Sequence, residues 1–287
     1  MLIDLHAHTT ASDGDLTPAE LVAAAAAAAV ATLAVTDHDT VAGLGAAVEA
    51  GAGHGVRVIP GIELTARVPH GSMHLLGYFD DVAPEPLVDR LEELSAYREI
   101  RIRAIVERLG DLGVELAWDD VRARAAGQLG RPHVAAALVG AGHVATREEA
   151  FDRWLADGRP AHVPSRGLEP DVAVRLVRAS GGVPVLAHPG SLALPARHLE
   201  SFVQRLAAHG LVGIEVHRPE HTPEARDAYR RIAKRLRLVP SGGSDFHRPD
   251  GPFALGDTGR PPLDPAAADL LFAAIAGAAA ERSSGRG

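Results

Sequence analysis

Short apolar runs rich in β-branched residues alternate along the chain with longer segments rich in alanine. This alternation is typical of parallel β-strands that are joined by crossover helices. We therefore expect an α/β fold with seven parallel strands, one fewer than in the common eight-stranded barrel. The predicted strands are Leu2–Leu5, Thr32–Thr36, Val56–Ile62, Met73–Phe79, Val183–Ala187, Val212–Val216 and Leu238–Ser241.

The starts of two predicted helices are marked in the sequence. Thr17 is a suitable N-cap, Pro18 suits the first helical position and Glu20 completes a capping box. The segment Thr222-Pro223-Glu224 has similar chemistry and predicts the start of a later helix. The polar tail Ala280–Gly287 is expected to be frayed.

The strand pattern is interrupted in the middle of the chain, from about Pro84 to Val163. There the spacing of apolar residues predicts one long helix and several shorter ones. These predicted helices are Leu87–Leu109, Trp118–Ala126, Pro132–Gly140 and Arg147–Ala156. We therefore expect three parts: a first part of the barrel in residues 1–83, a helical insertion in residues 84–163 and a second part of the barrel in residues 164–287.

The composition excludes several classes of function. A formal net charge of −8 argues against binding of duplex DNA or of anionic membranes, which needs a basic surface. The chain has no cysteine, so thiolate zinc sites and cysteine nucleophiles are excluded. No basic leader precedes an apolar run, and the apolar stretch Val22–Ala34 is far shorter than the roughly 20 residues that span a bilayer. We expect a soluble, cytoplasmic protein, and a monomer is compatible with these features.

Many of the 15 histidines follow the predicted strands directly, together with acidic residues. In a parallel barrel the carboxyl ends of the strands meet at one rim, so these distant residues would form one cluster. The candidates at strand ends are His6, His8, Asp37, His38, Asp39, Glu63, His188, Glu215, His217, Asp245 and His247. His74 lies within the fourth predicted strand, and Asp13 lies in the loop after the first.

A single histidine or aspartate is more often a hydrogen-bonded structural residue than a metal ligand. Such residues at nearly every strand end need another explanation, because many clustered imidazoles and carboxylates require cations to compensate them. Nitrogen and oxygen ligands without sulfur suit Mn²⁺, Zn²⁺ or Fe²⁺. Two such cations about 3.5–4 Å apart polarise a phosphoryl oxygen and generate hydroxide at neutral pH. The pattern therefore predicts hydrolysis that needs no nucleophilic serine.

At these residues the sequence resembles the PHP family, which is named for polymerase and histidinol phosphatase domains. The matching motifs are His6-x-His8, Thr36-Asp37-His38-Asp39, Leu186-Ala187-His188-Pro189-Gly190 and Ser244-Asp245-Phe246-His247. The resemblance covers most of the chain and implies a distorted seven-stranded (β/α)7 barrel, with a small helical insertion domain between strands 4 and 5. It also implies two or three divalent metal ions, with Mn²⁺ as the expected ion and Zn²⁺ or Fe²⁺ as alternatives.

The resemblance also assigns the metal ligands. One ion would be held by His6, His8, Glu63 and Asp245, a second by Glu63, His74 and His188, and a third by Asp13, His38 and His247. Glu63 would bridge the first two ions, and Glu63, Asp13, His38 and Asp245 are the expected catalytic residues. Every expected ligand is present, which argues against a non-catalytic copy of the domain.

Further segments are similar to a small bacterial branch of this family, namely Ser12-Asp13-Gly14, Gly61-Ile62-Glu63, His74–Tyr78 and the inserted helices. That branch implies removal of the 3′-phosphate from nucleoside 3′,5′-bisphosphates, with short 5′-phosphorylated single-stranded RNA as a second substrate. The alternatives are a phosphatase of histidinol-phosphatase type for a small metabolite and a non-catalytic metal-binding accessory module. The insertion favours the larger substrate, because it could form a roof over the rim.

Three residues outside the ligand set are candidates for binding a 5′-phosphate. Arg131 opens a predicted helix, Arg159 lies where the insertion ends, and His221 precedes the cap at Thr222. An arginine suits a terminal phosphate, and a histidine near a helix N-terminus suits an anion. The alternatives are a surface ion pair for each arginine and an exposed loop position for His221. Glu215 and His217 lie at the rim but outside the ligand set, so they are candidates for residues that orient the metal ligands through hydrogen bonds.

Overall fold

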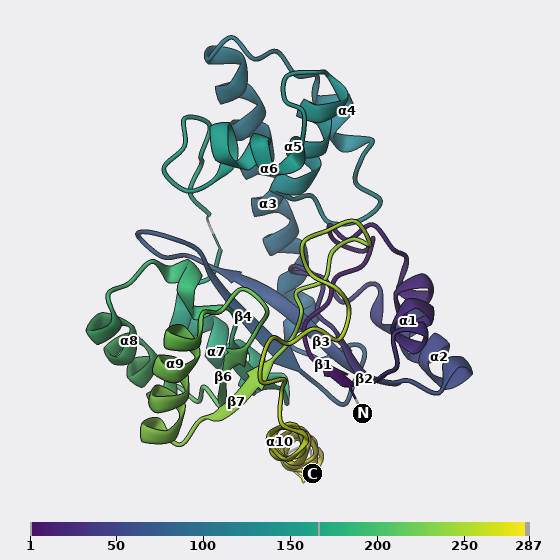
Figure 1. Cartoon of the computed structure of the whole chain (residues 1–287), viewed down its shortest axis with the longest axis vertical. Helices are drawn as coiled ribbons and strands as arrows, with labels where there is room; N and C mark the ends of the chain where they lie inside the picture. The colour runs from purple at the N-terminus through teal and green to yellow at the C-terminus, as the bar shows by residue number, and fades with distance from the viewer. Residues whose placement is uncertain (1, 166, 285–287) are drawn as a thin grey trace.

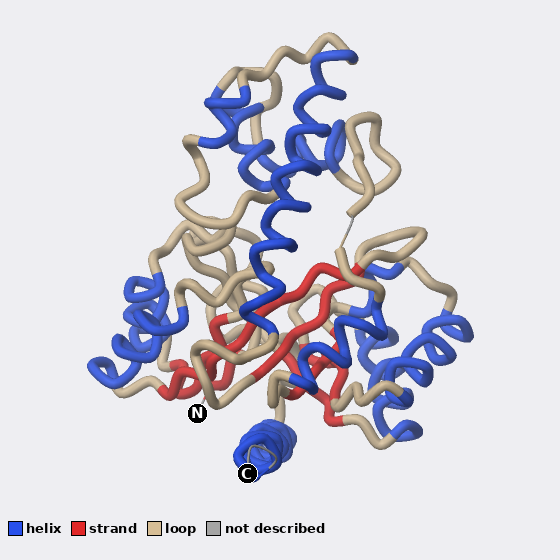
Figure 2. The backbone as a smooth tube through the Cα atoms, turned by 180° about the vertical axis from the view of Figure 1, so that it is seen from behind, coloured by secondary structure: helices blue, strands red, loops and turns tan. Residues whose placement is uncertain are grey.

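The computed structural model describes residues 2–165 and 167–284 (Figure 1). One sheet lies at its centre (Figure 2). It has seven strands, which are adjacent in the order in which they occur along the chain. The strands are β1 (Leu2–Asp4), β2 (Val30–Val35), β3 (Arg57–Ala66), β4 (Met73–Tyr78), β5 (Val183–Leu186), β6 (Gly213–His217) and β7 (Val239–Gly242). All seven predicted strands are therefore confirmed.

The sheet is mixed, so the prediction of seven parallel strands is wrong at β4. This strand pairs antiparallel with both β3 and β5, whereas the other neighbours pair in parallel. Residues 67–72 link Ala66 to Met73, and so short a link allows a hairpin, whereas a parallel crossover needs about a dozen residues or more. Because the chain reverses once into β4 and again into β5, β5 still runs in the same direction as β3.

Among the described residues no strand ladder joins β7 to β1, so the sheet is not a closed barrel. The two edges approach each other beyond β1 and β7, where an isolated bridge pairs Ala7 with Phe246. The backbone N–H of Asp245 donates to the carbonyl of His6 over 2.8 Å, and the N–H of His8 donates to the carbonyl of Phe246 over 2.9 Å. The segment after β7 therefore lies against the segment after β1.

Helices α1 (Pro18–Ala27) and α2 (Leu44–His54) pack against β2 and β3, α7 (Pro170–Ala179) packs against the central strands β3, β4 and β5, and α9 (Pro223–Leu236) packs against β6 and β7. Helix α8 (Ala196–Ala208) contacts α7 and α9, and a 3₁₀ turn η2 (Pro189–Leu192) follows β5. The predicted capping box is confirmed. The Thr17 hydroxyl accepts the N–H of Glu20, whose carboxylate accepts the N–H of Thr17 over 2.8 Å. Thr222 caps α9 in the same way and accepts the N–H of Ala225 over 3.2 Å.

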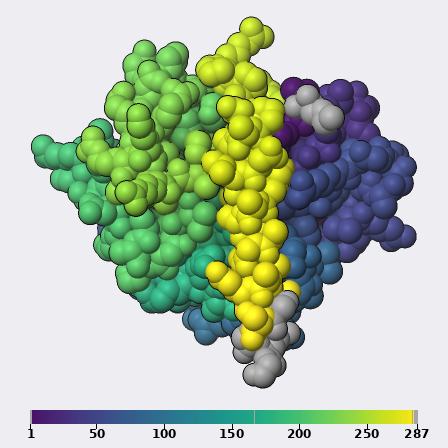
Figure 3. Space-filling view, turned by 90° about the horizontal axis from the view of Figure 1, so that it is seen from below, coloured from purple at the N-terminus to yellow at the C-terminus, as the bar shows by residue number. Residues whose placement is uncertain are grey.

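The C-terminal helix α10 (Pro265–Ser284) crosses the underside of the molecule between its N-terminal and C-terminal halves (Figure 3). Leu271 and Ile275 of this helix are buried in one hydrophobic cluster with Leu5 and Val183. The prediction of a frayed tail from Ala280 is therefore wrong as far as Ser284, because the helix continues to that residue. Residues 285–287 lie outside the described residues. None of the helices in the described part of the chain is long and apolar enough to cross a membrane.

The chain between β4 and β5 forms the predicted helices above the sheet (Figure 1). They are α3 (Leu87–Asp111), α4 (Trp118–Arg122), α5 (Arg131–Gly140) and α6 (Arg147–Ala150), followed by a π-helical turn η1 (Phe151–Leu155). These helices pack around a hydrophobic cluster of their own, which includes Ile105, Leu109, Val134 and Leu138. The division of the chain into three parts stays a prediction.

Candidate metal centre

The predicted ligands meet at the end of the sheet that faces the inserted helices. The residues that follow β1, β2, β5 and β7 are His6, His8, Asp13, His38, His188, Asp245 and His247, and His74 lies within β4. Glu63 was expected directly after the third strand, but β3 continues to Ala66, so Glu63 lies within it. Its pairing position opposite Leu76 of β4 keeps it beside the other ligands.

The ligand atoms form three groups, and within each group all of them lie within 4.8 Å of one another. The groups are His6, His8, Glu63 and Asp245; His8, Asp13, His38 and His247; and His38, Glu63 and His74. They contain eight of the nine residues that the family resemblance assigns as ligands. The ninth, His188, has its Nε2 2.9 Å from Oε1 of Glu63. The structure therefore brings all nine expected ligands together.

Glu63 lies at the centre of the cluster and is 1% exposed. Its Oε1 is 2.9 Å from Nδ1 of His74 and 2.9 Å from Nε2 of His188. Its Oε2 is 3.3 Å from His6, 3.2 Å from His8 and 3.1 Å from His38. Each carboxylate oxygen thus faces a separate set of imidazoles, which is the arrangement expected of a carboxylate that bridges two cations.

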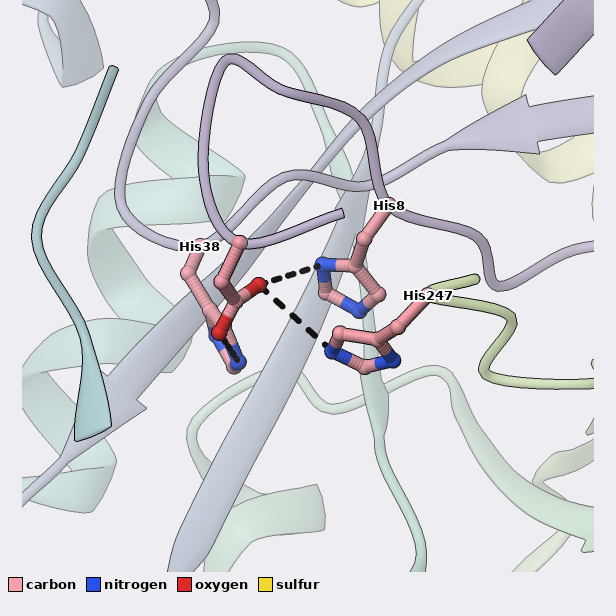
Figure 4. Close-up of side chains that lie close together, drawn as sticks. His8, His38 and His247 are labelled. Atoms are coloured by element: carbon pink, nitrogen blue, oxygen red, sulfur yellow. Dashed lines mark ion pairs between the residues drawn. The ribbon is translucent and has the colours of Figure 1, made fainter. Parts of the chain in front are cut away.

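Asp13 forms a second centre, around which His8, His38 and His247 converge (Figure 4). Its Oδ1 is 3.8 Å from Nδ1 of His8 and 3.5 Å from Nε2 of His247, and its Oδ2 is 3.8 Å from Nε2 of His38. These distances are too long for ordinary hydrogen bonds and leave space between the four side chains.

The chemistry of these atoms fits divalent cations. Four buried atoms of the candidate ligands lie 3.1–3.8 Å from polar atoms of the cluster but form no hydrogen bond, namely Nε2 of His6, Nδ1 of His8, Nδ1 of His38 and Oδ1 of Asp13. A buried polar atom without a partner costs about 1–3 kcal/mol, so a partner other than a protein hydrogen bond is expected. Nitrogen and oxygen ligands without sulfur suit a transition-metal cation.

The pKa values in the cluster are strongly perturbed. Burial alone would raise the pKa of Glu63 and of Asp13, but the surrounding imidazoles hold both well below the usual range. Burial alone would lower the pKa of His8, but Asp245 and Glu63 outweigh it and raise this pKa to about 10. Burial keeps the pKa of His38 well below its usual value. Ionised carboxylates thus face a mixture of charged and neutral imidazoles, and cation binding would displace the protons.

Glu215 and Arg218 contact residues of the candidate ligand set directly. Oε1 of Glu215 is 3.1 Å from Nδ1 of His6, and its Oε2 accepts the backbone N–H of His188 over 2.6 Å. Arg218 is 1% exposed and donates to Oδ2 of Asp245 over 3.0 Å. Glu215 therefore lies where the sequence suggested, whereas Arg218 was missed although it comes directly after the end of β6. His217 points elsewhere, because its Nδ1 is 3.1 Å from the carbonyl of Pro261.

Two further carboxylates that were not recognised as supports fix the loops that carry ligands. Asp37 accepts the N–H of Thr9 over 2.8 Å and the hydroxyl of Ser12 over 2.6 Å, which holds the loop that bears Asp13. Asp4 is fully buried and accepts the N–H of Ser244 over 2.8 Å and its hydroxyl over 2.6 Å. These bonds hold the segment that bears the ligand Asp245 against the start of the chain.

A cavity of about 360 Å³ opens beside the cluster and is lined by Arg98, Arg101 and Arg131 together with ligand residues; we call it the arginine cavity. Arg98 is paired with Asp39 at 2.5 Å, and Arg131 is paired with Asp157 at 3.2 Å. Arg101 donates to the carbonyl of Val163 over 2.8 Å, and no carboxylate among the described residues forms a salt bridge with it. Burial and the two neighbouring arginines lower the pKa of Arg101 to about 9, so an anion would be favoured here.

Arg159 and His221 do not line the arginine cavity that Arg131 lines. Arg159 is exposed and lines none of the cavities described here. His221 is buried rather than exposed, with its Nδ1 3.0 Å from the carbonyl of Val216 and its ring against Tyr229. Arg98 and Arg101 occupy the cavity instead, and the sequence did not single them out because they resemble the other charged residues of a long amphipathic helix.

The chain is similar to several known proteins. Residues 4–100 match the model of the PHP domain. The chain is 37% identical over 252 residues to the 5′-3′ exoribonuclease Rnm of Salmonella typhimurium, and the aligned region covers 87% of this chain and 86% of that protein. It is 33% identical over 249 residues to the 3′,5′-nucleoside bisphosphate phosphatase of Chromobacterium violaceum, and the aligned region covers 86% of this chain and 87% of that protein. A crystal structure from Bifidobacterium adolescentis, assigned as a metal-dependent phosphoesterase, has a TM-score of 0.84 at 33% identity. The superposed region covers 95% of this chain and 96% of that chain.

The ligand cluster and these similarities define the class of this protein. It is a metal-dependent hydrolase that acts on phosphoric ester bonds. Within that class, the chain belongs to the PHP family.

Proposed function

We propose that this phosphoesterase removes the 3′-phosphate from nucleoside 3′,5′-bisphosphates and also cleaves short 5′-phosphorylated RNA from its 5′ end. The observation that carries this proposal is the arginine cavity directly beside the ligand cluster. A phosphate at the cluster and a second phosphate at the arginines would both find partners in one cavity. The activities named for the relatives from Salmonella typhimurium and Chromobacterium violaceum support the same class of substrate.

In the proposed reaction water adds to the phosphorus of the 3′-phosphate, the bond from phosphorus to the 3′ oxygen breaks, and this oxygen takes up a proton. The ligand groups would hold two or three divalent cations, with Mn²⁺ expected, which polarise the phosphoryl oxygen and lower the pKa of water. Glu63, Asp13, His38 and Asp245 all line the arginine cavity and are the proposed catalytic residues.

Arg101 and Arg131 are the proposed partners of the 5′-phosphate. Arg98 is already engaged, because it is paired with Asp39 and also donates to Thr65 over 2.8 Å. Arg101 has donors that are not engaged by a carboxylate, and a phosphate would relieve its repulsion from the neighbouring arginines. Arg131 is paired with Asp157 and would exchange part of that contact for the phosphate.

Kinetics with two matched substrates test this proposal. Losing one charge-assisted contact costs about 2–3 kcal/mol, so Arg101→Ala and Arg131→Ala should each lower kcat/KM for adenosine 3′,5′-bisphosphate roughly 30- to 150-fold. Hydrolysis of adenosine 3′-monophosphate should hardly change, because that substrate never makes the contact. Arg159→Ala is the control, since this arginine is exposed outside the cavity and should behave as wild type.

Equal loss with both substrates would show that the two arginines serve the fold or the metal centre rather than a second phosphate. Unchanged kinetics with adenosine 3′,5′-bisphosphate would remove the 5′-phosphate contact from the proposal. If histidinol phosphate were the best substrate of the wild-type protein, the nucleotide assignment itself would be wrong.

A further inference from the structure

A second cavity opens beside Asp13, Asp245 and His247 of the ligand cluster. It has a volume of about 490 Å³ and shares these three residues, Pro132 and Phe151 with the arginine cavity. Phe253 and Pro252, which do not line the arginine cavity, give it a more apolar wall, and we call it the phenylalanine cavity. The ligand cluster therefore borders two adjoining cavities of different chemistry.

A nucleoside bisphosphate needs one of these cavities. Its scissile phosphate is a monoester, so a single organic group extends from phosphorus, and the arginine cavity would take that group with its 5′-phosphate. A phosphodiester carries a second organic group, which must leave the tetrahedral phosphorus in another direction. The phenylalanine cavity, which is also lined by Asp13, Asp245 and His247, gives that group a place.

The phenylalanine cavity continues into an outer cavity of about 660 Å³. The two share Arg147, Arg248 and Pro252, and the outer cavity adds Arg124 of the loop between α4 and α5. We call these two adjoining cavities together the path, which is lined by residues from the ligand cluster at one end and by Arg124 at the other. Its mixture of apolar and cationic side chains suits a short flexible strand.

Two residues along this path are free to contact a ligand. Phe253 is half-buried and belongs to none of the hydrophobic clusters formed by the described residues, so its ring is not committed to the core. Arg124 is exposed, and no carboxylate in the described part of the chain forms a salt bridge with it. By contrast, Arg147 is paired with Asp15 at 3.2 Å, and Arg248 is paired with Glu148.

We infer that the phenylalanine cavity and the outer cavity bind the RNA strand on the 3′ side of the scissile phosphate. This inference rests on the proposed function and assigns a binding site to the RNA strand which that function includes. The first downstream base stacks on Phe253, and a phosphate further along contacts Arg124. After cleavage the scissile phosphate stays on the 5′ oxygen of the downstream fragment, and the 3′ oxygen of the released nucleotide carries the proton.

The charges along the path limit the kind of nucleic acid that binds. Glu148, Asp152 and Asp250 line the two cavities beside the arginines, so the path has no excess of positive charge like that of a duplex-binding surface. Recognition therefore depends on stacking and on few phosphate contacts, which favours short single strands.

The test compares adenosine 3′,5′-bisphosphate with a 5′-phosphorylated adenylate trimer, both with the Mn²⁺-loaded enzyme. Loss of base–aromatic stacking corresponds to about a 5- to 150-fold change, so Phe253→Ala should lower kcat/KM for the trimer within that range. The bisphosphate has no downstream base, and its kcat/KM should change less than about twofold. Phe253→Tyr keeps an aromatic face and should restore turnover of the trimer.

The salt dependence of kcat/KM tests Arg124 separately. Each phosphate contact to a single strand adds about 0.7 to the slope of log affinity against log salt. Arg124→Ala should therefore flatten the slope for the trimer by about 0.7 and leave the slope for the bisphosphate unchanged. Arg231→Ala removes an exposed arginine from α9, at the opposite side of the sheet, and should leave both slopes unchanged.

The possible outcomes separate the inference from the function on which it rests. If the wild-type enzyme hydrolyses neither substrate, the proposed function is wrong. If it hydrolyses the bisphosphate but not the trimer, the downstream site and the RNA part of the proposed function are wrong, and the bisphosphate activity stands. If Phe253→Ala slows both substrates equally, the downstream site is wrong and the proposed function stands. Selective loss with the trimer supports the site.

Discussion

Replacing Glu215 by glutamine tests how far the metal centre depends on a residue that holds the ligands in place. Glu215 is fully buried and contacts Nδ1 of His6 through Oε1 and the N–H of His188 through Oε2, at 3.1 and 2.6 Å. Nη1 of Arg218 lies 3.5 Å from the same Oε2. Glutamine keeps the shape of the side chain but offers one acceptor oxygen, and its NH₂ group would face a donor at the other position.

Two effects determine the size of the loss. Burial alone would raise the pKa of Glu215, but His6 and Arg218 lower it to about 2, so a charged acceptor is lost at neutral pH. One unsatisfied buried group costs about 1–3 kcal/mol, which corresponds to a fall in Tm of about 2–12 °C at roughly 2–4 °C per kcal/mol. Changes to residues that orient metal ligands typically weaken metal binding 10- to 100-fold, and we expect a loss of Mn²⁺ affinity in that range.

Three measurements on Glu215→Gln check this reasoning: thermal unfolding of the metal-free protein, Mn²⁺ affinity by calorimetry, and hydrolysis as a function of Mn²⁺ concentration. Activity should return at high Mn²⁺, because every ligand is still present. Glu220→Gln is the matched control, since Glu220 also pairs with Arg218 at 3.0 Å but is 43% exposed. If Glu215→Gln binds Mn²⁺ as tightly as the wild type and unfolds at the same temperature, Glu215 does not hold the ligands.

Three other experiments examine the metal centre and the fold. Glu63→Gln should lower kcat by about 100-fold or more, and high Mn²⁺ should not restore it. His54→Gln on α2 is the control, and its kcat should equal that of the wild type. Chelation should abolish hydrolysis and lower the Tm, because ions present at 100 times their Kd stabilise the native state by about 2.7 kcal/mol. In urea unfolding, Leu271→Ala should cost about 2–5 kcal/mol because Leu271 is 1% exposed, whereas Leu270→Ala, at a position 60% exposed, should cost less than about 0.5 kcal/mol.

The positions of the strands could be predicted from the sequence because each is a local run of apolar residues. The direction of β4 was predicted wrongly, although residues 63–72 between the predicted strands Val56–Ile62 and Met73–Phe79 are already fewer than a parallel crossover needs. A link of that length cannot carry the chain back to the starting end of a strand. Loop length should therefore be weighed together with the strand pattern when a parallel sheet is predicted.

The candidate ligands lie close together because nearly all of them lie in or soon after a strand, with Asp13 in the loop that follows β1, and the topology of the sheet brings those positions together. The reversal of β4 did not disturb this, since His74 projects from within its strand toward Glu63. The arginine cavity was found only in part. Arg131 lines this cavity, as expected. Arg101 lines it because of the position of α3, and that position depends on tertiary packing, which leaves no local signal in the sequence.

The two halves of the chain each supply only part of the metal centre. Residues before the inserted helices provide Glu63 and most of its neighbouring histidines, whereas His188 follows β5, and Asp245 and His247 come from the segment after β7. No strand ladder among the described residues joins that segment to β1, and the contacts between them include the bridge between Ala7 and Phe246 and hydrogen bonds to Asp4. A cation bound by ligands from both halves would therefore strengthen a junction that has no strand ladder. Metal binding and closure of the two edges should then stabilise each other, because the complete ligand set exists only when the edges are together.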